Sequence, residues 1–278
     1  MFWQTTRFLI DLRRPQVMGI VNATPDSFFD GGRHADAHAA MAHCDRLLLE
    51  GADLLDIGGE STRPGARQPS LDEELARVLP VLRHAVTLGV PVSVDTSRPE
   101  VMAAALDAGV DIVNDVRSFT RPGALAEVSA HAGCGLCLMH MQGEPGSMQR
   151  APHYGGDAVR DVVDWLRLRL QAVQLAGVAL PRIALDPGIG FGKTPEHNWA
   201  LLQRQAELRA LGRPLLLGWS RKSTLGALTG RPVGERLVPS VVAALACVQR
   251  GAQVVRVHDV AATVDALKIW RAAGLLAS

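Results

Sequence analysis

Short runs of β-branched and other apolar residues alternate along the chain with longer segments in which apolar positions recur at helical spacing. The apolar runs predict strands at residues 17–21, 54–57, 90–94, 112–113, 136–139, 183–185, 215–217 and 254–257. The helical pattern covers residues 37–50, 71–88, 99–108, 157–176, 196–211, 236–250 and 260–273. Strand and helix thus alternate throughout, which is typical of an α/β protein with a parallel sheet.

Two helix starts carry a local signature. Ser70 with Glu73, and Ser97 with Glu100, have the spacing of a capping box, in which a hydroxyl and a carboxylate satisfy free backbone N–H groups at the first turn. We therefore predict that helices begin directly after both serines.

Polar residues follow nearly every predicted strand. They are Asn22, Asp56, Asp95, Asn114, His140, Asp186, Ser220 and Arg256. In a (β/α)8 TIM barrel the carboxyl ends of all strands form one mouth, where catalytic groups gather, whereas an open doubly wound sheet concentrates them at its switch point. We therefore predict a single barrel over residues 17–278, with the open sheet as the alternative. Residues 1–16 form an N-terminal segment that either caps the barrel bottom or trails from it.

Composition excludes several classes of function. The chain has 278 residues, 29 Lys and Arg against 28 Asp and Glu, and a net charge of +1, so no strong field attracts nucleic acid or an acidic membrane. Charged residues or prolines interrupt every apolar run before the roughly 18 residues of a membrane helix accumulate. The four scattered cysteines do not form a disulfide framework. We expect a cytoplasmic protein without a signal peptide.

Two motifs invite chemistry that their context disfavours. Cys134 and Cys137 have redox spacing, but they fall at a strand, where residues three apart face opposite ways, so we predict two core thiols. The run Gly188-Ile-Gly-Phe-Gly-Lys-Thr194 ends like a phosphate-binding loop, but Pro187 stands where that motif requires its first glycine. It remains a loop whose backbone either approaches a ligand closely or makes a plain turn.

The remaining clusters suggest a site with two poles. Asp95, Asn114 and Asp186 are acceptors at strand ends, and a heterocycle rich in N–H donors would satisfy them. Arg256 and His258 alternate onto one side of the last strand, as suits an oxyanion. Two long loops at residues 22–32 and 58–65, and the Ser-Arg-Lys-Ser run at residues 220–223, add hydroxyls and charges at the same mouth.

Seven motifs together resemble those of the dihydropteroate synthase family, in order from about residue 17 to 275. They are Met18-Gly-Ile-Val-Asn-Ala-Thr-Pro-Asp-Ser-Phe28, Asp56-Ile-Gly-Gly-Glu-Ser-Thr-Arg-Pro-Gly65, Ser93-Val-Asp-Thr96, Met139-His-Met-Gln142, Asp186-Pro-Gly-Ile-Gly-Phe-Gly-Lys193, Ser220-Arg-Lys-Ser223 and Arg256-Val-His-Asp259. The resemblance implies a folate-pathway transferase that joins 6-hydroxymethyl-7,8-dihydropterin diphosphate to 4-aminobenzoate and releases diphosphate. It also implies Mg²⁺, a homodimer packed through late helices and sensitivity to sulfonamides.

The resemblance assigns roles by matching position. The catalytic residues it implies are Asp26, Arg63, Asp95, Asp186 and Lys222. The substrate-binding residues it implies are Asn22, Phe28, Thr62, Arg63, Pro64, Asp95, Asn114, Met139, Asp186, Phe191, Arg221, Lys222, Ser223, Arg256 and His258. Among these, Asn22 would also contact Mg²⁺. Phe29 and Trp219 depart from the family's usual residues, which bears on loop closure and on the aminobenzoate pocket.

Two other functions compete with this interpretation. A pterin-binding methyltransferase barrel would share the acidic floor but would not need the Arg256 and His258 pair. A silent barrel that binds pterin, or stabilises a partner, would be expected to lack Asp26, Asp186 or Lys222, and all three are present.

Overall fold

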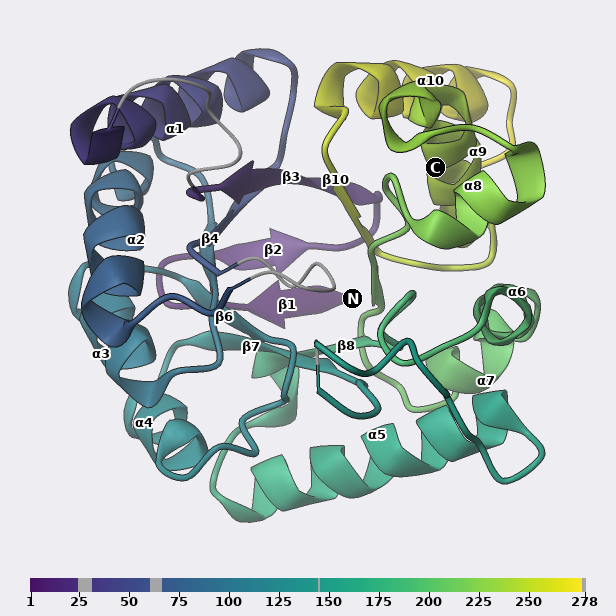
Figure 1. The fold of residues 1–278 in the computed structure, drawn as a ribbon, viewed down its shortest axis with the longest axis horizontal. Coiled ribbons are helices and arrows are strands. Elements are labelled where there is room, and N and C mark those ends of the chain that lie inside the picture. Colours follow the sequence, from purple (N-terminus) through teal and green to yellow (C-terminus); the bar gives the residue numbers. More distant parts are fainter. Residues whose placement is uncertain (25–31, 61–66, 145, 277–278) are drawn as a thin grey trace.

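The computed structural model describes residues 1–24, 32–60, 67–144 and 146–276 (Figure 1). Its strands are β1 (Phe2–Gln4), β2 (Leu9–Asp11), β3 (Gln16–Asn22), β4 (Leu54–Gly58), β5 (Val92–Asp95), β6 (Ile112–Asp115), β7 (Gly135–Met139), β8 (Ile183–Asp186), β9 (Leu216–Leu217) and β10 (Val254–Val257). Its α-helices are α1 (Gly32–Leu49), α2 (Leu71–Val86), α3 (Pro99–Asp107), α4 (Ala124–Ala130), α5 (Ala158–Leu175), α6 (Pro195–Gln203), α7 (Gln205–Arg209), α8 (Ser223–Thr229), α9 (Leu237–Gln249) and α10 (Val260–Ala272).

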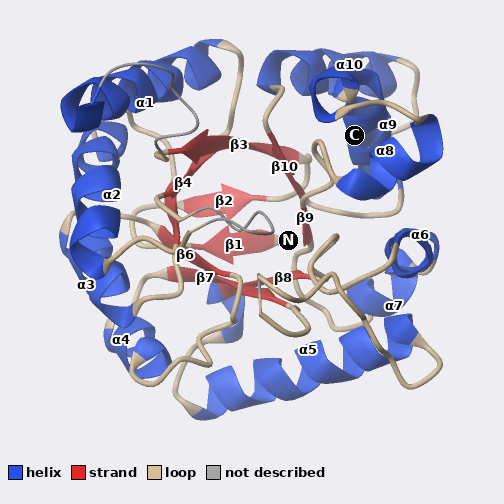
Figure 2. Cartoon of the chain, in the orientation of Figure 1, coloured by secondary structure: helices blue, strands red, loops and turns tan. Residues whose placement is uncertain are grey.

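Eight parallel strands form one sheet in the order β8-β7-β6-β5-β4-β3-β10-β9. The sheet closes on itself, because Leu185 of β8 bridges Leu215, just before β9, and the Leu185 N–H donates to the Pro214 carbonyl at 2.8 Å. Helices surround this ring of strands (Figure 2). The result is the predicted (β/α)8 TIM barrel, and each of the eight predicted strands is confirmed, with no end shifted by more than two residues.

Helix α2 shows how the sequence produces the outer layer. Its apolar residues Val78, Val81, Leu82 and Ala85 recur at helical spacing and are buried against the barrel. The predicted capping box at its start is confirmed: the Glu73 N–H donates to the Ser70 hydroxyl, and the Ser70 N–H donates to the Glu73 carboxylate.

Two local predictions are wrong. The second capping box does not form, because the Ser97 hydroxyl donates to the buried Asp115 carboxylate at 2.5 Å, and Arg98 takes the N-cap position of α3. The single helix predicted over residues 196–211 is two helices, α6 and α7, with Arg204 between them. There Arg204 forms ion pairs with Asp157 and Glu207, contacts that helical periodicity does not reveal.

The N-terminal residues form an antiparallel hairpin of β1 and β2, which lies across the centre of the strand ring in Figure 1. Its Trp3 side chain is fully buried, and the indole N–H donates to the Arg182 carbonyl at 2.9 Å. Trp3 belongs to an apolar cluster with Met18, Leu54 and Val254, residues at the starts of barrel strands. The hairpin therefore fills the end of the barrel opposite the strand carboxyl ends.

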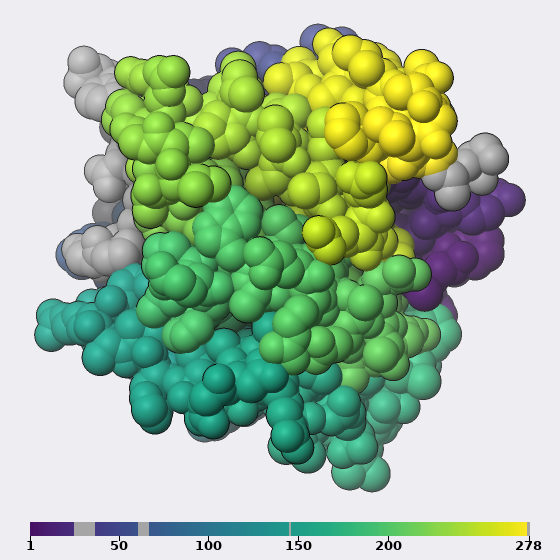
Figure 3. Space-filling view, turned by 90° about the vertical axis from the view of Figure 1, so that its right-hand side faces the viewer, coloured from purple at the N-terminus to yellow at the C-terminus, as the bar shows by residue number. Residues whose placement is uncertain are grey.

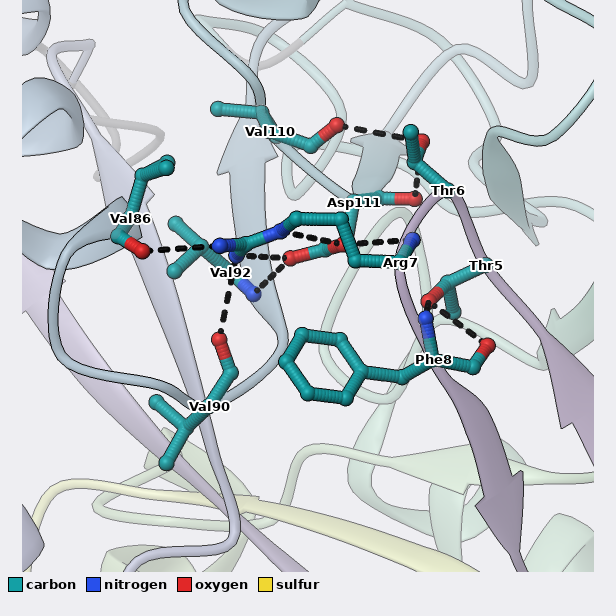
Figure 4. Close-up of polar contacts among 9 residues, drawn as sticks. All are labelled: Thr5, Thr6, Arg7, Phe8, Val86, Val90, Val92, Val110 and Asp111. Atoms are coloured by element: carbon teal, nitrogen blue, oxygen red, sulfur yellow. Dashed lines mark hydrogen bonds and ion pairs between the residues drawn. The ribbon is translucent and has the colours of Figure 1, made fainter.

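One arginine fastens this hairpin to the barrel (Figure 4). The Arg7 guanidinium donates to both oxygens of the fully buried Asp111 carboxylate, at 3.0 and 2.5 Å, and to the carbonyls of Val86 and Val90. Asp111 also accepts the Val92 N–H at 2.9 Å. Because several donors share one buried carboxylate, the hairpin, the start of β5 and the start of β6 are held as a unit.

The structure also bears on the predictions for the two cysteines and for membrane-spanning helices. Cys134 and Cys137 are buried free thiols in separate apolar clusters, and burial raises the pKa of Cys134 to about 12, so the prediction of core thiols is confirmed. Within the described ranges, every helix is too short or too polar to cross a bilayer.

Candidate functional site

The strand carboxyl ends bring the predicted acceptors together. Asp95 ends β5 and is in register with Asn114 of β6, while Asp186 ends β8 and is in register with Met139 of β7. Asn114, Met139 and Asp186 are all less than 9% exposed. Parallel strands thus place amide and carboxylate groups from the ends of β5, β6 and β8 on one partly desolvated floor.

A buried ion-pair network occupies one side of this floor. Arg256 of β10 donates from Nε to Asp56 Oδ2 at 2.6 Å and from Nη2 to Asp95 Oδ2 at 2.8 Å. The Asn114 side-chain amide also donates to Asp56 Oδ2, at 3.4 Å. Burial raises the pKa of Asp95, and the Arg256 guanidinium opposes that effect. Arg256, predicted to hold an oxyanion, is therefore directed toward two carboxylates in this structure.

Asp186 and Lys222 form the other side. The Gly188 N–H donates to Asp186 at 2.7 Å, yet burial still raises the pKa of this carboxyl. Lys222 directly precedes α8, and burial lowers its pKa to about 8, against the attraction of Asp186. The Lys222 ammonium lies 4.1 Å from the centre of the Phe191 ring, a cation–π contact. This places a cation, an aromatic face and a carboxylate beside one another.

The glycine-rich loop after β8 makes close backbone approaches to the segment that follows β7. Gly188 has φ +70°, and a Cβ there would lie 1.9 Å from the His140 carbonyl oxygen; at Gly192 it would lie 2.3 Å from the Gln142 carbonyl oxygen. Only glycine fits such positions. Lys193 is buried and contacts His140 and the Phe191 carbonyl.

The predicted cationic pole contains a neutral imidazole. The His258 ring nitrogen Nδ1 is 2.9 Å from the Ser220 hydroxyl, and burial followed by the nearby Arg221 and Arg256 charges lowers the His258 pKa to about 3. Arg221, at φ +59°, pairs with Asp259 at 2.6 Å. His258 therefore acts at neutral pH as a hydrogen-bonding group, not as a cation.

The other predicted residues lie around this floor or outside the described ranges. Asn22 ends β3 in register with Gly58, and Ser223 is the first residue of α8. Trp219 is buried with its ring centre 4.9 Å from that of Trp199. The predicted site residues outside the described ranges are Asp26, Phe28, Thr62, Arg63 and Pro64, and the same holds for Phe29.

Two residues at the site were not among its predicted members, although Asp56 was predicted to lie at the barrel mouth. Asp56 is fully buried, and its Oδ1 atom is without a hydrogen-bond partner within the part of the chain that the structure describes. Its position between Leu55 and Ile57 in a buried strand could have indicated an inward-facing carboxylate. Lys193 carried no such signal, because its partners are His140, directly after β7, and Phe191 in its own loop.

The chain matches the family model of pterin binding enzymes over residues 18–258. It is also 53% identical to the dihydropteroate synthase of Neisseria meningitidis serogroup B, over 98% of each chain. This chain belongs to the dihydropteroate synthase family. The sequence resemblance is thereby confirmed, and it spans the whole barrel.

Solved structures of the family share this fold closely. Dihydropteroate synthase from Xanthomonas albilineans, solved with 4-aminobenzoic acid, is 51% identical with a TM-score of 0.90, over 96% of this chain and 95% of that one. The Burkholderia cenocepacia enzyme, complexed with 7,8-dihydropteroate, is 51% identical with a TM-score of 0.89, over 98% and 96%. Agreement at this level makes the TIM barrel of the dihydropteroate synthase family the fold of this chain.

Proposed function

We propose that this chain is a transferase of folate biosynthesis that condenses 6-hydroxymethyl-7,8-dihydropterin diphosphate with 4-aminobenzoate to give 7,8-dihydropteroate and diphosphate. The observation that carries the proposal is the floor formed by Asp95, Asn114, Asp186 and Lys222. Family membership at more than half sequence identity supports the same reaction.

The floor suits a pterin ring because the two are complementary in donors and acceptors. A dihydropterin carries an amino group and ring N–H groups, which the buried oxygens of Asp95, Asn114 and Asp186 can accept. Lys222 donates to the ring carbonyl or a ring nitrogen, and the Phe191 ring beside it covers an aromatic face. Buried acceptors without donors are costly, so the site selects a donor-rich heterocycle.

The reaction proceeds by loss of diphosphate from the pterin methylene carbon before the amine attacks. Cleavage of the C–O bond leaves a resonance-stabilised cation, and the carboxylates of Asp186 and Asp95 stabilise the charge as it spreads through the ring. The amine of 4-aminobenzoate then forms the C–N bond with its lone pair and passes a proton to the released diphosphate or to water. An aniline nitrogen is neutral at pH 7, so the attack needs no strong base.

The leaving diphosphate meets Arg256 and His258. Arg256 is already held at the floor by Asp56 and Asp95, so its charge is placed before substrate arrives. Neutral His258 donates an N–H to a phosphate oxygen. We assign Asp26 and Arg63 to the diphosphate and the reacting centre, and the aminobenzoate pocket to Thr62, Arg63, Pro64 and Ser223. Phe28, Met139, Phe191 and Arg221 would line or cover the rings.

The residues present fit a Mg²⁺ ion that arrives with the diphosphate. Asn22, at the end of β3, offers one hard oxygen ligand, and Mg²⁺ typically takes one or two protein oxygens together with substrate phosphates and water. No group of three His, Cys, Asp or Glu residues in the described ranges could hold the ion by itself. When bound, Mg²⁺ would supply positive charge to the leaving diphosphate.

The test follows diphosphate release from the purified chain given the dihydropterin diphosphate and Mg²⁺, with and without 4-aminobenzoate, together with dihydropteroate by chromatography. Release that depends on 4-aminobenzoate and matches dihydropteroate formation is expected. Pterin binding without product would refute the synthase and support a silent barrel.

The proposed assembly is a homodimer formed through α8, α9 and the turn between them. Five aliphatic side chains on these elements are 45 to 69% exposed, and they are Leu228, Val233, Leu237, Val238 and Val242. Figure 3 shows residues of α8 and α9 together on one face of the molecule. Exposure of such an apolar cluster to water is unfavourable, and a second copy of the chain that covers the cluster removes this exposure.

Substituting Val238 by aspartate tests the dimer. Val238 is 69% exposed, so the change leaves the fold intact but puts a charge in the proposed interface. We expect the wild type to sediment as a dimer and Val238→Asp as a monomer, with Leu168→Asp on α5, 67% exposed, as the control that stays dimeric. A monomeric wild type would contradict the proposal.

A cytoplasmic location is supported by four buried free thiols.

A further inference from the structure

Lys193 is a buried lysine that the proposed reaction does not use. Its side-chain amine lies 2.9 Å from Nδ1 of His140, 3.3 Å from the His140 carbonyl oxygen and 3.1 Å from the Phe191 carbonyl oxygen. The residue is 3% exposed, and burial lowers its pKa to about 7. Desolvation of a buried amine costs free energy even when it has three acceptors, which suggests that Lys193 has a role that offsets this cost.

We propose that Lys193 is a positioning residue for the pterin floor, which fixes the loop of Phe191 so that the Phe191 ring stays against the Lys222 ammonium. The inference rests on the function proposed above. Lys193 acts through Phe191 and Lys222 and does not itself touch the substrate.

His140, the partner of Lys193 directly after β7, is itself held by packing. The His140 ring packs edge-on against Trp165, with ring centres 5.1 Å apart and an interplanar angle of 87°, and it lies 6.1 Å from Tyr154. Burial and the Lys193 charge lower the His140 pKa to about 2, so the ring is neutral and Nδ1 can accept a hydrogen bond. Lys193 therefore ties the loop to a fixed point on the barrel wall.

The same loop connects directly to the floor. Phe191, whose carbonyl oxygen Lys193 holds, places its ring 4.1 Å from Lys222 Nζ. Gly190 in the loop packs against Lys222, since a Cβ there would lie 3.1 Å from Lys222 Cδ. Gly188, at the start of the loop, donates to Asp186. A displacement of this loop would disturb the contact between Phe191 and Lys222 and leave Arg256 of β10, which is proposed to bind diphosphate, in place.

The experiment compares Lys193→Met, which keeps length but removes the donor, with the wild type in steady-state assays of both substrates. We expect the KM for dihydropterin diphosphate to rise roughly 10- to 100-fold, because small displacements of positioning groups have effects of this size. The KM for 4-aminobenzoate should change less than about two-fold, as should kcat. Lys268→Met is the control, since Lys268 is 71% exposed on α10 and should match the wild type.

A double-mutant cycle separates positioning from general stability. If Lys193 acts through the Phe191 ring, Lys193→Met in a Phe191→Leu background should raise the pterin KM by less than about three-fold more, so that the two changes are not additive. Lys193→Gln, which restores a donor, should recover part of the loss, and it replaces Lys193→Met in every comparison if the latter does not fold.

Three outcomes would overturn the inference. They are a pterin KM within about two-fold of wild type, equal losses for both substrates, and full additivity with Phe191→Leu. A wild type that neither binds the pterin nor forms dihydropteroate would instead refute the proposed function itself. An active wild type with a matching Lys193→Met refutes the positioning role alone.

Discussion

Replacing Arg256 with methionine would leave two buried carboxylates facing one another. Asp56 is fully buried and the Asp95 side chain is 19% exposed, while Arg256 itself is 22% exposed. Removing one partner of a buried ion pair costs about 3 to 5 kcal/mol of stability. Because Arg256 and Asp95 keep some exposure to water, we expect a cost near the lower end, about 3 kcal/mol. For a chain of this length that corresponds to a fall in Tm of roughly 5 °C.

The pH dependence has a definite sign. Burial raises the Asp95 pKa above its ordinary 3.8, and Arg256→Met raises it further by removing the charge that lowers it. An acid whose folded pKa is raised loses stability as pH rises through the interval between the unfolded and folded values. The stability gap between variant and wild type should therefore be widest near pH 8 and narrow at about pH 5, where Asp95 binds a proton.

Thermal unfolding at several pH values measures this gap, and Asp56→Asn combined with Arg256→Met isolates its cause. The double variant removes one of the two facing charges, so it should recover at least half of the lost stability while turnover stays low. A double variant that is less stable than Arg256→Met, or a gap that widens on acidification, would refute the reasoning.

Two further predictions concern the opposite ends of the barrel. Asp186→Asn should lower kcat/KM by roughly a thousand-fold while Tm stays level or rises, because the amide avoids burying a charge; near-native turnover in the standard assay would rule out its electrostatic role. Trp3→Ala should lower the unfolding free energy by about 3 to 5 kcal/mol, measured by denaturant titration, and leave kcat/KM of the folded protein unchanged; a loss of activity in proportion would show that the hairpin contributes to the site.

The barrel was predictable from the sequence because its strands are buried on both faces and its helices on one. Such patterns depend only on the spacing of apolar residues along the chain. Eight alternating strand and helix segments are compatible with few folds. The hairpin of β1 and β2 was not predicted, because strands of three residues are too short to show alternation. Helix α4, with seven residues, was missed for the same reason.

Contacts between distant segments account for the remaining errors. Ser97 has the right neighbour for a capping box, but a buried carboxylate on β6 competes for its hydroxyl. For the site, motif spacing identified Asp95, Asn114, Asp186 and Lys222, which the barrel gathers at one mouth. It did not show that Arg256 is engaged by Asp56, since that pairing joins strands about 200 residues apart in the chain.

The hairpin at the closed end also constrains the order of folding. Trp3 is synthesised before the barrel, but its bonding partner Arg182 lies 179 residues later and its apolar neighbour Val254 later still. At typical rates of synthesis, about 10 to 50 s pass between the synthesis of Trp3 and that of these two partners. The full environment of Trp3 is therefore complete only after Val254 has been made, and the solvent protection of the Trp3 indole reports when that end of the barrel has closed.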